Sequence, residues 1–342
     1  MFSRNIFAGF LIAIVSFTLC GSVAAQGTWA VEKTFHIGGE GGWDYVTADP
    51  LNHRLYVPRS THTMVIDADS GTTIADIPGQ KHNHGVALVP GAGRGFISDG
   101  NGAVIIFDLK TNAVLGTLKA QPDADGIIFD KASGLVLVVS GDNGVLMTVK
   151  PDVDPKTGSI DAPIELGGKP EFLASDGAGK VYINLEDKNQ IAVVDLKARN
   201  VLAHWAVAPG GSPVGLSIDT KKRRLFIGCR NPQKLIVIST DDGKVIADLP
   251  IGAGVDATKF DGQQAFASCR DGKLVIAGEN ASGKFEVQQT VSTPVGARTM
   301  DIDPEAHRVY LATAEFEEQK AGATGRPAAK PGTFMIVVVA RH

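Results

Sequence analysis

Side chains that bind ions and exchange protons recur along this chain at intervals of about forty residues. Seven anchor positions follow one another in steps of 40, 41, 46, 43, 42 and 42 residues, and Val214 alone among them is apolar: Asp44, His84, Asp125, Glu171, Val214, Asp256 and Arg298. Carboxylates and imidazole ligate divalent cations and transfer protons, whereas guanidinium groups bind anions. The anchors therefore predict a polar site, provided that the fold brings them together.

The elements that must position these anchors are short strands. Each anchor begins an apolar run, and Asp follows five residues later in six of the seven copies. A Gly-, Lys- or Arg-rich turn and three further β-rich runs come next, as in RLYVP, TMVID and TIADIP of the first copy. A period near forty residues is typical of a propeller or a solenoid, and four strands per copy favour the propeller. The sequence therefore predicts an all-β, seven-bladed β-propeller with four strands per blade.

The two ends of the chain predict how the ring closes. The seventh copy ends after its third strand, FMIVVV, whereas WAVEKTFHI at residues 29–37 precedes the first copy. We therefore expect the N-terminal strand to complete the last blade, which makes residues 26–342 a single domain. One insertion, residues 317–332, is rich in Ala, Gly and Pro and is predicted to be a flexible surface loop.

The strands and hairpins resemble those of a known family. RLYV, KVYIN and RVYLA, the VIDADSGT and VVDLKARN hairpins and the forty-residue period are similar to the YVTN-repeat, YncE-like bacterial propellers. The resemblance covers roughly residues 28–342. It implies the propeller fold and a periplasmic or secreted location, but no reaction. Seven-bladed lactonases are similar in architecture only, so no catalytic role is carried over from them.

Propeller geometry converts repeat position into location. The first strand of each blade lines the central channel, so the anchors should form an inner ring on one face. The loops between second and third strands should form a ring above and outside it: Arg59 and His62, Asp99, Asp142, Glu186, Arg230 and Asn231, Arg270 and Glu315. Acidic side chains dominate copies one to four, and arginines dominate copies five to seven.

This division predicts a funnel with two unlike halves. Asp44, His84 and Asp125 could hold a divalent metal ion, the one cofactor that the sequence suggests, and the arginines could hold an anionic group. The catalytic candidates are His84, Glu171, Glu186 and Arg298, and the ligand-binding candidates are Trp43, Asp44, Asp125, Arg230, Asp256, Arg270 and Glu315. A structural alternative stays open, in which the same groups only bond loop amides and one another.

Composition and the N-terminus indicate the compartment. The chain has 342 residues, 44% hydrophobic and 20% charged, with a net charge of −4, so no basic excess favours nucleic acid. The basic cluster 221–224 is interpreted as a solvated turn.

The N-terminus predicts a signal peptide over 1–25, cleaved near Ala25, because it contains Arg4, the apolar run 6–19 and Val23-Ala24-Ala25. We expect a periplasmic or secreted monomer with no transmembrane anchor, and free thiols at Cys229 and Cys269.

Two functions follow from these observations. The first is a ligand- or partner-binding module that takes a small molecule or a protein at the funnel face. The alternative is a small-molecule enzyme of lyase or lactonase-hydrolase type that uses the carboxylates, His84 and the arginines. Fold alone does not separate the two.

Overall fold

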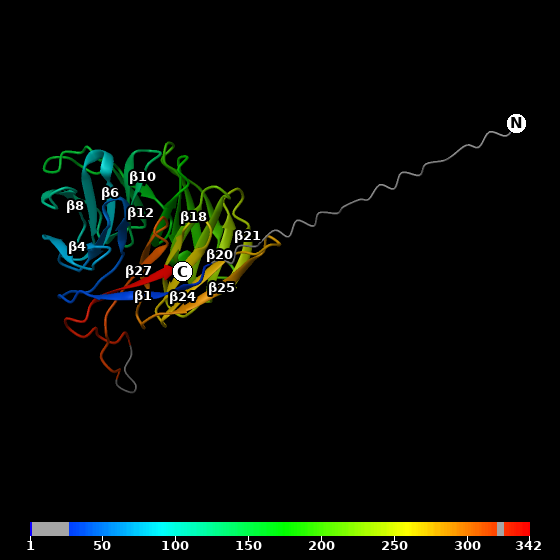
Figure 1. Ribbon diagram of the computed structural model, residues 1–342. Coiled ribbons are helices and arrows are strands. Elements are labelled where there is room, and N and C mark those ends of the chain that lie inside the picture. Colours follow the sequence, from blue (N-terminus) through cyan, green and yellow to red (C-terminus); the bar gives the residue numbers. More distant parts are fainter. Residues whose placement is uncertain (2–26, 320–324) are drawn as a thin grey trace.

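The computed structural model describes Met1 and residues 27–319 and 325–342, so the predicted signal peptide lies outside the described residues apart from Met1. Seven antiparallel sheets of four strands each are arranged in a ring (Figure 1). The all-β, seven-bladed propeller predicted from the sequence is confirmed. None of the helices among the described residues has the length and apolarity needed to span a membrane.

The first four blades follow the repeats in order. Their strands are β2 (Thr47–Asp49), β3 (Arg54–Pro58), β4 (Thr63–Asp67) and β5 (Thr73–Ile77); β6 (Asn83–Val89), β7 (Arg94–Asp99), β8 (Ala103–Asp108) and β9 (Val114–Lys119); β10 (Ala124–Asp130), β11 (Leu135–Ser140), β12 (Val145–Val149) and β13 (Ile164–Glu165); β14 (Pro170–Ser175), β15 (Lys180–Leu185), β16 (Gln190–Asp195) and β17 (Asn200–Ala206). Short 3-10 turns follow β2, β6 and β15: η1 (Pro50–Asn52), η2 (Pro90–Ala92) and η3 (Glu186–Lys188).

The remaining blades complete the ring. Their strands are β18 (Pro213–Asp219), β19 (Arg224–Arg230), β20 (Gln233–Ser239) and β21 (Val245–Pro250); β22 (Val255–Phe260), β23 (Ala265–Cys269), β24 (Lys273–Glu279) and β25 (Phe285–Ser292); β26 (Thr299–Asp303), β27 (Arg308–Thr313), β28 (Met335–Arg341) and β1 (Trp29–His36).

The last blade closes with the N-terminal strand, as predicted. β1 pairs antiparallel with β28, from Trp29 opposite Arg341 to His36 opposite Met335, and the two strands lie side by side in Figure 1. The Trp29 ring is buried against Phe266, 4.9 Å between centroids, and its indole N–H donates to Gln264 at 2.8 Å. Both ends of the described domain are therefore held by one ladder and by the sixth blade.

Burial explains the strand patterns. The middle strands of each blade have neighbouring blades on both faces, so they are apolar without alternation, as in β12, where every residue is buried. The outer strand β17 has one solvated face and alternates between exposed and half-buried residues.

The Asp that recurs five residues after each anchor is a turn residue. Asp219, for example, accepts hydrogen bonds from the backbone N–H groups of Lys221 and Lys222, both at 3.0 Å. Asp49, Asp130, Asp176, Asp261 and Asp303 accept comparable bonds in the turns that follow them. This repeated residue therefore stabilises the turn between the first and second strands and takes no part in the funnel.

Backbone bulges orient the anchors. In five blades the register of the first strand shifts at the anchor, for instance between Asn83 and Val86 around His84 and between Val255 and Ala257 around Asp256. The other shifts surround Asp125, Glu171 and Val214. A bulge bends a strand and changes the direction of the side chain at that point.

The long insertion is hydrogen bonded at its base. Phe316 pairs with Ala329, and the Glu317 N–H donates to the Ala328 carbonyl at 2.8 Å. Residues 320–324 lie outside the described part of the chain. The two described cysteines, Cys229 and Cys269, are buried free thiols, as predicted.

Candidate functional site

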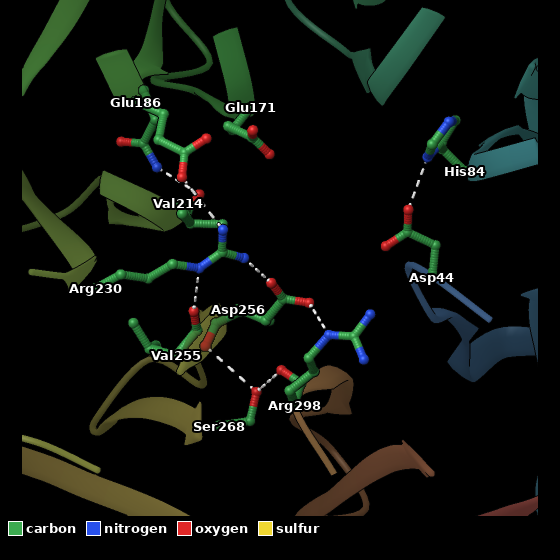
Figure 2. Close-up of polar contacts among 12 residues, drawn as sticks. Asp44, His84, Glu171, Glu186, Val214, Arg230, Val255, Asp256, Ser268 and Arg298 are labelled. Atoms are coloured by element: carbon green, nitrogen blue, oxygen red, sulfur yellow. Dashed lines mark hydrogen bonds and ion pairs between the residues drawn. The ribbon is translucent and has the colours of Figure 1, made fainter. Parts of the chain in front are cut away.

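Eight of the predicted residues form one polar ring at the channel mouth, which we call the central funnel: Asp44, His84, Asp125, Glu171, Glu186, Arg230, Asp256 and Arg298. Figure 2 shows Asp44 and His84 on one side and Glu186, Arg230, Asp256 and Arg298 on the other. The ring arises from the anchor positions. His84, Asp125, Glu171 and Asp256 lie at bulges of first strands, and Arg298 directly precedes the first strand of its blade.

The arginine side of the funnel is bonded internally. Asp256, with 11% of its side chain exposed, accepts from Arg230 through one carboxylate oxygen and from Arg298 Nε at 2.9 Å through the other. Arg230 also donates to Glu186 at 3.2 Å and to the Val255 carbonyl at 3.1 Å. These contacts fix the orientation of all four side chains.

Guanidinium donors nevertheless remain free on this side. Arg298 uses only its Nε, and among the described residues its two terminal amino groups have no hydrogen-bond partner; Figure 2 shows them directed away from Asp256. The Arg270 side chain makes neither a hydrogen bond nor an ion pair with the described part of the chain. Burial, and then the charges of Arg326 and Arg298, lower the pKa of Arg270. The positive charge in this sector is therefore not fully compensated.

The acidic side centres on one imidazole. His84 Nδ1 lies 2.7 Å from Asp44 Oδ2 and 3.4 Å from Asp125 Oδ1. One ligand atom from each of the three residues lies within 4.8 Å of the others, a spacing suited to a metal ion. The predicted Asp44–His84–Asp125 group thus comes together in space.

Proton affinity is high on this side. Burial alone would lower the pKa of His84, but the hydrogen bond to Asp44 and the charge of Asp125 outweigh it and raise that pKa from 6.5 to about 9. Burial raises the pKa of Asp125 to about 7, although the His84 charge opposes this. Two buried atoms, His84 Nε2 and Asp125 Oδ1, have no hydrogen-bond partner among the described residues. The acidic side therefore retains protons and unused ligand atoms.

Glu171 and Glu186 lie in one blade and approach each other, as the sequence suggested. Burial, then the charge of Asp125 and contact with Glu186, raise the pKa of Glu171 to about 9. Glu186 instead pairs with Arg230. Lys169 is 3.9 Å from Glu171 and lowers its pKa only in part. A carboxylic acid that is neutral at pH 7 beside a paired carboxylate can donate a proton to a ligand.

Two residues that interact electrostatically with the funnel side chains or with Arg270 were not identified from the sequence. Tyr45 lies between the two sides: burial, then the charges of Asp125, Asp44 and Glu171, raise its pKa well above the usual value, and its ring contacts Phe172, 4.5 Å between centroids. Arg326, from the long insertion, acts on Arg270. The adjacency of Tyr45 to an anchor was a usable signal, whereas nothing in the sequence places Arg326.

The side chains of Trp43 and Glu315 make no hydrogen bond, ion pair or ring contact with the eight funnel residues, and their role in ligand binding stays a prediction. Trp43 contacts Phe334 and Phe316, 5.6 and 6.2 Å between centroids. Glu315 is 57% exposed and pairs with Lys330, because its loop continues into the insertion. Of the remaining outer-ring residues, Arg59 and Asp99 are buried in loop contacts, His62 is near Asp76 at 3.6 Å, and Asp142 and Asn231 are exposed.

The basic cluster 221–224 is largely exposed, as the expected solvated turn requires, with 59% of the Lys222 side chain and 64% of the Arg223 side chain accessible. Arg224 and Lys222 both form ion pairs with Glu279, and the Arg224 guanidinium lies 5.0 Å from the Phe285 ring centroid. Arg224 and Lys222 thus join the fifth blade to the sixth, because Glu279 lies in β24.

Comparison with known proteins identifies the architecture. No family model matches the chain, and no curated protein matches its sequence. Among solved structures, a chain of Kuenenia stuttgartiensis hydrazine synthase is similar with a TM-score of 0.69 and 12% identity, covering 81% of this chain and 94% of that one. A chain of the mitotic checkpoint complex gives a TM-score of 0.72 and 12% identity, covering 97% of this chain and 99% of that one. At such identities the likeness shows the propeller fold alone.

Proposed function

We propose that this chain is a periplasmic or secreted, YncE-like binding module that takes a small anionic ligand in its central funnel. Location and family rest on the predicted signal peptide over 1–25 and on the strand repeats. The ligand class rests on one observation, which is that the terminal amino groups of Arg298 and the whole Arg270 guanidinium have no partner among the described residues.

The chemistry of the funnel suits a carboxylate. Terminal guanidinium nitrogens bind both oxygens of a carboxylate in a fork, and a ligand here would relieve the repulsion among Arg270, Arg298 and Arg326. Glu171, which holds its proton at neutral pH, adds a neutral donor across the channel. Ligand binding that removes such strain stabilises the folded chain.

Calorimetric titration with acetate, succinate and citrate tests this proposal. We expect one of these anions to bind, and Arg298→Ala to weaken it at least tenfold because about 1.4 kcal/mol of charge-assisted bonding is lost. Lys222→Ala, on the opposite face, is the matched control and should bind as the wild type does. Equal affinity in the Arg298 variant, or no binding by any of the three anions, would rule out this site.

A second function is favoured by the Asp44–His84–Asp125 group, whose ligand atoms lie within 4.8 Å of one another. A divalent cation there, with Glu171 as a proton donor, would suit the lyase or lactonase-hydrolase alternative. The test is titration with Mn²⁺ and Zn²⁺, together with a lactone-hydrolysis assay. Asp125→Asn should abolish metal binding, whereas the exposed Asp142→Asn in the same blade should not. Absence of both metal binding and turnover would exclude the enzyme, and only the binding module would remain.

A further inference from the structure

A cavity separate from the funnel lies between the glycine-rich loop 38–43 and residues 329–332. Its volume is about 360 Å³, and its walls include Trp43, Phe334 and Pro331. We call it the glycine-loop pocket. Cavities of this size with mainly apolar walls and few polar groups are the usual form of small-molecule sites.

The floor of the glycine-loop pocket is a buried positive charge. Arg59 is 1% exposed, and its guanidinium lies 3.9 Å from the Phe334 ring centroid. It donates to the carbonyls of Gly38, Gly41 and Gly42 at 3.0–3.1 Å and to Met64 Sδ. These bonds use four of the five guanidinium N–H donors and leave one on Nη2.

No carboxylate compensates this charge. Among the described residues no acidic oxygen lies within 4.0 Å of the Arg59 guanidinium. Glu40, on the same loop, is exposed, and Lys330 at the other wall pairs with Glu315 at 3.3 Å. Burial accordingly lowers the pKa of Arg59 to about 10, with only a weak opposing effect of Asp76. Carbonyl dipoles hold the cation in place without neutralising it.

The GGEGG sequence at 38–42 makes this arrangement possible. Gly41 has φ +90°, and a Cβ there would lie 2.2 Å from the Arg59 carbonyl oxygen. Only glycine fits this approach, so the loop can bring three carbonyls to one guanidinium.

One residue of the pocket wall, Trp43, carries an unused donor. Trp43 Nε1 is shielded from solvent and has no hydrogen-bond partner in the described part of the chain. Trp29 illustrates the contrast, since its indole N–H donates to Gln264 at 2.8 Å. A buried indole N–H without an acceptor is costly, and a ligand oxygen would remove that cost.

We propose that the glycine-loop pocket binds a small organic carboxylate with an apolar body. The carboxylate accepts from the free Nη2 donor of Arg59 and from Trp43 Nε1, and the body packs between Trp43, Phe334 and Pro331. Two donors match the two oxygens of one carboxylate, whereas a phosphate dianion would bring more charge than a single buried cation balances. This site is separate from the funnel and does not depend on the function proposed for it.

Calorimetry and tryptophan fluorescence with benzoate, and with its neutral isostere benzamide, test the proposal. Benzoate should bind at least tenfold more tightly than benzamide and change the emission of Trp43. Trp43→Phe keeps an aromatic wall and removes only the donor and part of the ring, and we expect it to weaken benzoate about tenfold. Trp205→Phe, at a distant outer strand, is the matched control and should bind as the wild type does.

The two sites are distinguished by a third variant. Arg298→Ala changes only the funnel, so benzoate affinity for the glycine-loop pocket should be unchanged in this variant, whether or not the funnel binds anions. Equal affinity for benzoate and benzamide, unchanged benzoate affinity in Trp43→Phe, or no benzoate binding would each overturn the proposal. Circular dichroism and melting of Trp43→Phe show that loss of binding is not loss of fold.

Discussion

On the arginine side of the central funnel every carboxylate contacts a guanidinium, whereas on the acidic side one imidazole serves two carboxylates. Asp256 and Glu186 are paired with Arg230 and Arg298, and the surplus on that side is positive charge. Asp44 and Asp125 share His84, and the surplus there is negative charge that raises pKa values. The same ring of first-strand positions thus yields one sector that needs anions and one that holds protons or cations.

This difference predicts different sensitivities to mutation. Removing one partner of a buried ion pair lowers the free energy of unfolding, because the remaining charge is buried and unpaired. Groups with raised pKa values respond instead to pH, because they can neutralise themselves.

The largest expected effect is that of Asp256→Asn. It leaves Arg230 and Arg298 without their shared carboxylate, so we expect a loss of about 3 kcal/mol in the free energy of unfolding. Urea unfolding measures it. Asp44→Asn, with 31% of the wild-type side chain exposed, is the comparison on the acidic side and should lose no more than about 1 kcal/mol. Equal losses would mean that the two sides do not differ as described.

The next effect is a pH dependence. The folded pKa of Glu171 is raised to about 9 from 4.5, and that of His84 to about 9 from 6.5, so the folded chain retains protons that the unfolded chain releases. Stability should therefore fall as the pH rises from 6.5 to 9, by up to about 1.4 kcal/mol per unit for each group.

Glu171→Gln mimics the protonated carboxyl and removes its part of this slope. Between pH 6.5 and 8 we expect the variant to lose about 2 kcal/mol less than the wild type does. Thermal melts over this range provide the measurement, and Glu305→Gln, an exposed acid in the turn after β26, is the matched control. A wild-type slope in the Glu171 variant would show that this carboxyl is ionised in the folded chain.

The smallest effect is expected at Arg270 and has the opposite sign. Arg270 makes no ion pair with the described residues and lies near Arg298 and Arg326. Replacing it with Ala should remove repulsion and raise the free energy of unfolding by about 0.5 kcal/mol in ligand-free protein. Chemical denaturation at low salt would detect this gain. A clear loss of stability would indicate that Arg270 has an anionic partner.

The sequence predicted the parts of this account that the repeat determines. Asp44, His84, Asp125, Glu171, Asp256 and Arg298 share a repeat position, so strand order alone places them on one ring. Pairing of β1 with β28 was equally predictable, because the last repeat lacks a fourth strand and the N-terminal strand belongs to no other repeat.

The contacts that depend on loop conformation could not be predicted from the sequence. Arg59 and Arg230 occupy comparable loops, yet Arg59 turns into the loop 38–42 while Arg230 turns into the funnel. That choice depends on the positive φ angles of nearby glycines and on which acids lie within reach. The raised pKa of Glu171 likewise follows from burial and from Asp125, which is 46 residues away in the chain, so no local pattern indicates it.

Anomalous diffraction from a crystal soaked in sodium bromide tests the central claim most directly. The arginine side offers uncompensated donors at Arg298 and Arg270, so a bromide peak should lie within hydrogen-bond reach of the Arg298 terminal amino groups. None should lie beside Asp44, His84 and Asp125, where the surplus charge is negative. A funnel without bromide on the arginine side, or with bromide among the acidic residues, would contradict the division of the funnel into an anion-binding side and a proton- or cation-binding side.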